Sequence, residues 1–142
     1  MDDIDPEDPS RNAPTFAGEF AAVMQKYKQI QPKAKFFLVT MPKTPHHGAQ
    51  AEEKADAHQK LMYDLAEYFD NTYVIDLREY GPVYDQKFYD HFWIGGHLNA
   101  QGYLLTARMV VSYMDYIIRH NPEDFRQVGF IGKGPYYHGL KW

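Results

Sequence analysis

Two short apolar segments, each placed between longer amphipathic ones, constrain the fold of this chain more than any other feature. "AKFFLVTMP" (34–42) is bounded by prolines, and "NTYVIDL" (71–77) is apolar and β-branched; both patterns are typical of buried strands. Helical periodicity occupies 16–30, 51–69 and 99–120. The order helix, strand, helix, strand, helix predicts an α/β fold whose parallel strands are joined by right-handed helical crossovers.

Local signals mark the ends of the helices. Thr15 is a plausible N-cap of the first helix and Asn99 of the last, while Gln31-Pro32 and Asn121-Pro122 end them. Apolar residues at helical spacing predict the three buried faces: Phe16, Phe20, Val23, Tyr27 and Ile30; Ala55, His58, Leu61, Met62, Leu65 and Phe69; and Tyr103, Ala107, Val110, Met114, Ile117 and Ile118.

The domain limits follow from composition. Residues 1–13 are acidic and contain prolines, which predicts an extended or disordered lead-in, and residues 14–142 form one α/β domain. "RQVGFIG" (126–132) is a candidate for a last short strand. Two or three strands make a thin sheet for three long helices. We therefore expect a homo-oligomer, or a separate N-terminal segment, to cover the bare edge and apolar faces.

Charge and composition exclude several classes of partner. The 142 residues carry a net charge of −4 and no long run of Lys or Arg, so we expect neither nucleic acid nor anionic membrane as a partner. The absence of cysteine removes disulfides, thiolate chemistry and cysteine-based zinc sites. The acidic N-terminus does not resemble a signal peptide, and as written the chain is expected to be cytoplasmic, although full-length relatives could be secreted.

His97 is the strongest candidate for a functional side chain. Gly95 and Gly96 precede it and Asn99 follows, so the histidine lies in a glycine-rich turn just before a helix. Such a position gives an imidazole a fixed direction near solvent, as a general base requires. The structural alternative is a histidine that only hydrogen-bonds a backbone carbonyl in a capping loop.

Other residues after the two strands are weaker candidates. Asp76 either belongs to a site or caps the following loop. The aromatic segment 80–93, which includes Trp93, either lines a pocket for a carbohydrate or acyl group or packs against itself. His46-His47 has no ligand spacing to other histidines or carboxylates, so we expect no metal and no cofactor.

The stretch "GGHLNAQGY" resembles the last conserved block of the SGNH (GDSL) hydrolases, in which His-x-Asn-x-x-Gly is followed by a tyrosine or another hydrophobic residue. His97, Asn99, Gly102 and Tyr103 match it, and the preceding order of strands is similar over roughly 15–120. The resemblance implies a three-layer α/β/α flavodoxin-like fold with a partial parallel sheet. It also implies hydrolysis of a small ester or an acylated carbohydrate, with His97 as the base that serves a serine nucleophile.

The chain also departs from that family. It lacks the Gly-Asp-Ser block and the oxyanion-hole Gly and Asn, and neither of its serines, Ser10 and Ser112, follows a strand. The position three before His97 is Ile94 where the family has Asp. Asp90, Asp85 or a backbone carbonyl remains as the partner of His97.

These departures predict the C-terminal part of an ester hydrolase, inactive alone, with His97 and Asp90 as catalytic candidates and Trp93 and Asn99 as substrate-binding candidates. The alternative from another class is a non-enzymatic binding or assembly domain that uses the aromatic loop 80–93.

Overall fold

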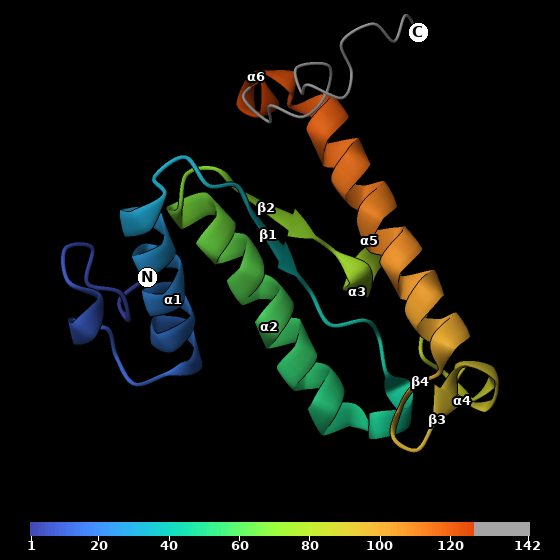
Figure 1. Cartoon of the computed structure of the whole chain (residues 1–142). Coiled ribbons are helices and arrows are strands. Elements are labelled where there is room, and N and C mark those ends of the chain that lie inside the picture. The colour runs from blue at the N-terminus through green and yellow to red at the C-terminus, as the bar shows by residue number, and fades with distance from the viewer. Residues whose placement is uncertain (127–142) are drawn as a thin grey trace, which may run out of the picture.

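The computed structural model describes residues 1–126, which form a mixed α/β arrangement (Figure 1). The main elements are α1 (Phe16–Ile30), β1 (Phe36–Val39), α2 (Ala49–Tyr68), β2 (Thr72–Ile75) and α5 (Ala100–His120), with short helices α3 (Leu77–Tyr80), α4 (Gln86–Phe92) and α6 (Pro122–Phe125). A hairpin of β3 (Trp93–Ile94) and β4 (His97–Leu98) precedes α5, and single turns η1 (Pro9–Arg11) and η2 (Pro45–His47) complete the set. The expected order of helices and strands is confirmed for this part of the chain.

The strands β1 and β2 pair in parallel, with Phe36 opposite Thr72 and Val39 opposite Ile75. Helices lie on both faces of this small sheet (Figure 1). On one face, α1 and α2 enclose a core that contains Met24, Leu38, Met62 and Leu65. On the other face, α5 and α6 cover a second core with the buried residues Ile75, Leu77, Ile117 and Phe125. The predicted strand at 126–132 falls almost wholly outside the described residues.

The structure agrees with the predicted buried face of α2 better than with that of α5. In α2, Ala55, Met62, Leu65 and Phe69 are buried as expected, because this helix lies directly on the sheet. In α5, only Ile117 of the predicted face is buried, and Tyr103 is 57% exposed. Within residues 1–126, α5 contacts the narrow sheet mainly through β2, and its other contacts are with the short elements α4, β4 and α6, so much of its predicted face is left uncovered.

The predicted buried face of α1 is wrong except at Phe20, which packs against the first core. Val23, Tyr27 and Ile30 are 57%, 60% and 83% exposed, whereas Ala21 and Met24 are buried against α2 and the sheet. The helix has two adjacent apolar faces, and periodicity cannot tell which of them the rest of the chain will cover.

The acidic lead-in, expected to be extended or disordered, packs against α1 and the first core. Ile4 is buried in the first core, and the Gln25 side-chain amide of α1 donates to the Asp5 carbonyl at 2.7 Å. Asn12 joins the two segments, because its Nδ2 lies 2.8 Å from Gln25 Oε1 and its Oδ1 accepts from the Asp5 N–H. One apolar side chain and a few long-range hydrogen bonds hold a segment whose overall composition is polar. Among residues 1–126, no helix has the length and apolar character that a membrane crossing requires.

Candidate functional site

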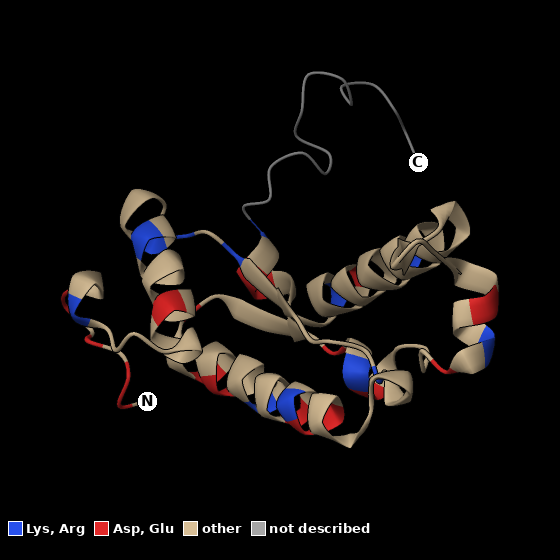
Figure 2. Cartoon of the chain, turned by 90° about the horizontal axis from the view of Figure 1, so that it is seen from below, with Lys and Arg blue, Asp and Glu red and all other residues tan. Residues whose placement is uncertain are grey.

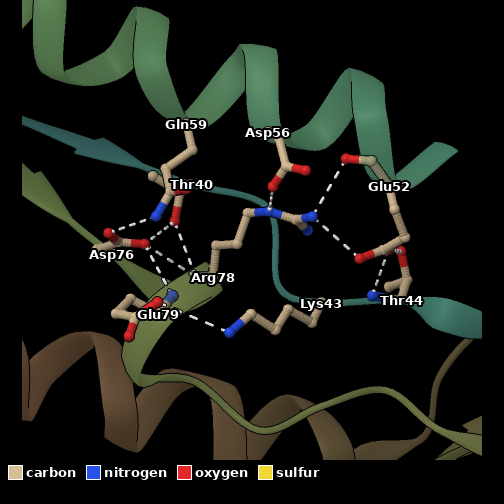
Figure 3. Close-up of polar contacts among 9 residues, drawn as sticks. All are labelled: Thr40, Lys43, Thr44, Glu52, Asp56, Gln59, Asp76, Arg78 and Glu79. Atoms are coloured by element: carbon tan, nitrogen blue, oxygen red, sulfur yellow. Dashed lines mark hydrogen bonds and ion pairs between the residues drawn. The ribbon is translucent and has the colours of Figure 1, made fainter. Parts of the chain in front are cut away.

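Thr40 and Asp76 directly follow the paired ends of the two parallel strands, at the sheet edge where α/β proteins gather functional groups. Asp76 is 2% exposed. Its carboxylate accepts hydrogen bonds from three side chains: Thr40 Oγ1 at 2.9 Å, and Gln59 Nε2 and Tyr63 OH, each at 2.8 Å. It also accepts from two backbone N–H groups of α3. Burial alone would raise the pKa of Asp76, but these hydrogen bonds together hold it below its ordinary value. Asp76 therefore caps α3 and ties α2 to both strands (Figure 3).

Arg78 forms a second buried polar centre next to Asp76 (Figure 3). Its side chain is 4% exposed. The Nε atom of Arg78 lies 2.6 Å from Asp56 Oδ1. Its Nη2 atom lies 3.0 Å from Glu52 Oε2 and also donates a hydrogen bond to the Glu52 backbone carbonyl. Its Nη1 has no hydrogen-bond partner within residues 1–126. Burial opposes the charged form, yet the two carboxylates raise the pKa of the guanidinium. The cation thus joins the end of β2 to the start of α2.

The aromatic segment divides into a packed part and a half-exposed part. Tyr84 and Phe88 are buried and stacked at 4.0 Å, and the Tyr84 N–H donates to the Lys43 carbonyl at 2.7 Å. Tyr89 instead lies between the rings of His46, at 4.6 Å, and Trp93, at 4.5 Å. The hydroxyl of Tyr89 also lies 2.7 Å from Nε2 of the exposed His47. Both interpretations of the segment therefore apply, each to different side chains.

The hairpin that carries His97 is closed by two glycines. Gly95 has φ +58° and Gly96 has φ +86°, values in the left-handed region that glycine enters without a Cβ penalty. Ile94 pairs with His97, and Trp93 pairs with Leu98. Because neighbouring residues of a strand point to opposite faces, His97 lies with the exposed Ile94, whereas Trp93 lies on the face that packs against Tyr89. The two candidate site residues therefore point to different sides of the hairpin.

Asn99 and Gly102 connect this hairpin to α5. Asn99 Oδ1 accepts from the Gly102 N–H at 2.9 Å, as predicted for an N-cap, and its Nδ2 donates to the His91 carbonyl at 2.8 Å. Gly102 is buried, and a Cβ there would lie 2.7 Å from the Phe92 carbonyl oxygen. The amide of Asn99 is engaged by the backbone at both ends, so its role in substrate binding stays a prediction.

The acid partner of His97 is not assigned by these contacts. Asp90 Oδ1 accepts from Gln86 Nε2 at 2.8 Å, and Asp85 caps α4 through the Phe88 N–H. Within residues 1–126 neither carboxylate has a hydrogen bond or ion pair with His97. The catalytic role of Asp90 thus remains a prediction.

Both serines of the chain lie on elements other than the hairpin that carries His97. Ser10 bonds to Asp8 in the lead-in. Ser112 lies on α5, roughly 18 Å along the helix axis beyond Ala100. It lines a largely apolar groove of about 580 Å³ between α3 and α5, together with Tyr80, Arg108, Met109, Tyr113 and Tyr116. Among residues 1–126, no histidine lines that groove beside Ser112.

Sequence reasoning missed the buried network around Asp76 and Arg78. The available signal was an acidic and a basic residue separated by a single residue, immediately after a buried strand, at the expected site edge. Their partners Glu52, Asp56, Gln59 and Tyr63 lie on α2 and carry no local signal.

In residues 1–126, no three His, Asp or Glu side chains are grouped in a way that could hold a metal ion. Comparison of the chain with protein family models, with curated proteins and with solved structures found no match.

Proposed function

We propose that this chain is the C-terminal part of an SGNH-type ester hydrolase with a three-layer α/β/α flavodoxin-like fold, in which His97 is the catalytic base. The observation that carries the proposal is the pairing of an exposed histidine with a turn built around it: the Gly95-Gly96 turn and the Asn99 cap fix the backbone on both sides of His97. The imidazole itself makes no hydrogen bond with the described residues that would give it a structural task.

The chemistry follows from what such a base can do. A serine hydroxyl supplied by other polypeptide would transfer its proton to His97 as its oxygen attacks the ester carbonyl, and the imidazolium would then give that proton to the leaving alcohol. Water, losing a proton to His97, would attack the acyl group left on the serine, and the imidazolium would return the proton to the serine oxygen as the carboxylic acid leaves. This chain provides the base but no serine near it. The proposed substrate is a small ester, with an acetyl group on a carbohydrate as a candidate, and the chain is inactive alone.

The decisive experiment reads the DNA upstream of Met1 for an in-frame Gly-Asp-Ser block and expresses the extended chain. We expect the extended chain to hydrolyse a nitrophenyl acetate and the chain of 142 residues not to. His97→Ala should lower kcat of the extended chain by about a thousandfold or more. His91→Ala is the matched control, because His91 is also exposed and lies on the neighbouring helix α4.

Two results would contradict the proposal. Hydrolysis that survives His97→Ala in the extended chain would remove His97 as the base. Hydrolysis by the 142-residue chain that disappears in His97→Ala would show that this chain contains its own nucleophile.

A second candidate function, a non-enzymatic binding domain, is favoured by one observation. The rings of His46, Tyr89 and Trp93 form a tilted aromatic cluster on a partly exposed surface, and such rings can pack against the apolar face of a sugar or another flat ligand. Sugar binding that is lost in Trp93→Ala and retained in His97→Ala would favour this function, since the two side chains lie on opposite faces of the hairpin.

A further inference from the structure

Among residues 1–126, the groove between α3 and α5 is lined by side chains of these two helices alone, and none comes from the hairpin that carries His97. Its volume is about 580 Å³, a size typical of sites for small molecules. Tyr80 of α3 and Tyr113 and Tyr116 of α5 supply three aromatic rings. Successive ring centroids are 6.0 and 6.2 Å apart, and Met109 adds a flexible apolar side chain. The groove therefore offers a largely apolar surface on the other part of α5.

Arg108 supplies the positive charge of this groove. Four of the five arginines of the chain form an ion pair with a carboxylate within residues 1–126, namely Arg11, Arg78, Arg119 and Arg126. Arg108 forms none among the same residues. The reason lies in the sequence of α5, because residues 100–114 contain no Asp or Glu and no acid lies three or four positions from Arg108. Figure 2 shows no red along this part of the helix.

Ser112 adds a second polar group beside that charge. It follows Arg108 by four residues, so the two side chains are neighbours on one face of α5, and both line the groove. A guanidinium and a hydroxyl in this arrangement can donate hydrogen bonds to the same carboxylate. The tyrosine rings and Met109 would then cover an apolar body attached to it.

We infer that the groove between α3 and α5 binds a small amphipathic carboxylate, whose aryl or acyl body packs on the tyrosine rings and whose charge pairs with Arg108. The single positive charge at an otherwise apolar groove selects a ligand with one negative charge over a neutral one of the same shape. A polypeptide segment fits less well, because α3, which forms one wall, consists of only the four residues Leu77–Tyr80. The inference goes beyond the proposed function and does not depend on it.

The test titrates the full isotope-labelled chain with naphthoate and follows the backbone amide signals by NMR. Naphthamide, which has the same rings and no charge, is the matched ligand. We expect naphthoate to shift the signals of groove residues such as Tyr80 and Tyr113 in a saturable way. It should bind about tenfold more tightly than naphthamide, and this difference should shrink at about 0.5 M salt.

Arg108→Gln tests the site from the protein side. It should weaken naphthoate by about tenfold and leave naphthamide unchanged, because only the carboxylate interacts with the guanidinium charge. Arg119→Gln is the matched control, since Arg119 is also on α5 but pairs with Asp115 at 2.7 Å and does not line the groove. Ser112→Trp should fill the groove and weaken both ligands, and the exposure of Ser112 should preserve the fold, which circular dichroism checks for each variant.

Several results would overturn the inference: equal binding of naphthoate and naphthamide, equal effects of Arg108→Gln and Arg119→Gln, or no saturation at millimolar naphthoate. Signal shifts confined to residues outside the groove would also overturn it. Light scattering that finds a dimer of this chain, dissociated by Ser112→Trp, would overturn it in favour of a second copy. None of these measurements uses ester hydrolysis, so the carboxylate site and the proposed catalytic role can fail separately.

Discussion

Two of the four residues that resemble the SGNH block, Asn99 and Gly102, are explained by contacts within the fold. Asn99 caps α5 and holds the His91 carbonyl, and Gly102 lets the first turn of α5 approach the Phe92 carbonyl. His97 and Tyr103 are exposed and have no comparable structural task within residues 1–126. The block therefore combines residues that build a turn with residues that the turn presents to solvent.

At this residue scale, Gly102→Ala should destabilise the chain. A Cβ would lie 2.7 Å from the Phe92 oxygen and 3.0 Å from a Leu98 methyl, and the clash should outweigh the better helix propensity of alanine. We expect a loss of about 1–3 kcal/mol in the free energy of unfolding, measured with urea. Gln101→Ala, at the exposed preceding position, is the control; equal effects of the two substitutions would contradict the close contact.

At the scale of elements, α1 is the helix whose buried face differs most from the one that the sequence predicts. Its two apolar faces are adjacent, and the one that the sequence pattern favoured is the one left exposed. The buried face uses Ala21 and Met24, which pack with Leu38 and Met62. Within residues 1–126, only one of the two apolar faces of α1 is covered.

A pair of neighbouring substitutions tests this orientation. Met24→Ala should cost about 2–5 kcal/mol in the free energy of unfolding, because it empties part of the first core. Val23→Ala should stay within about 0.5 kcal/mol. Urea unfolding of both variants provides the measurement. A loss at Val23 as large as that at Met24 would mean that the face of α1 that carries Val23 is covered in solution.

At the scale of the whole molecule, Asp76 joins four elements through one carboxylate. Its donors come from β1, α2 and α3, and it ends β2. Because its pKa is lowered in the folded state, its contribution to stability is fully present above the unfolded value of about 3.9 and is lost as the pH falls through the lower folded pKa.

Asp76→Asn should therefore lower the free energy of unfolding at neutral pH by about 1–3 kcal/mol. The difference between this variant and the native chain should shrink as the pH falls below about 3.9, when urea unfolding is followed from pH 7 into the acid range. Asp64→Asn, which removes an exposed carboxylate that pairs with Lys60 at 2.5 Å, should change stability by less than about 0.5 kcal/mol. A pH-independent difference for Asp76→Asn would contradict the role of its charge.

The sequence by itself determined the structural features that depend on residues close to one another in the chain. The caps at Thr15 and Asn99 act on backbone groups three residues away, and the Gly95-Gly96 turn joins adjacent strands. The limits of α1, the two parallel strands and the exposed position of His97 could therefore be predicted without the tertiary structure.

Only the tertiary structure decided which side chains meet across long stretches of chain. Ile4 enters the core that α1 and α2 form, Arg78 is buried beside carboxylates of α2, and Trp93 turns away from His97. The physical reason is that burial depends on what lies opposite a surface. Periodicity marks an apolar face such as that of Val23, Tyr27 and Ile30 on α1, but it carries no information on whether this chain, or another one, covers that face.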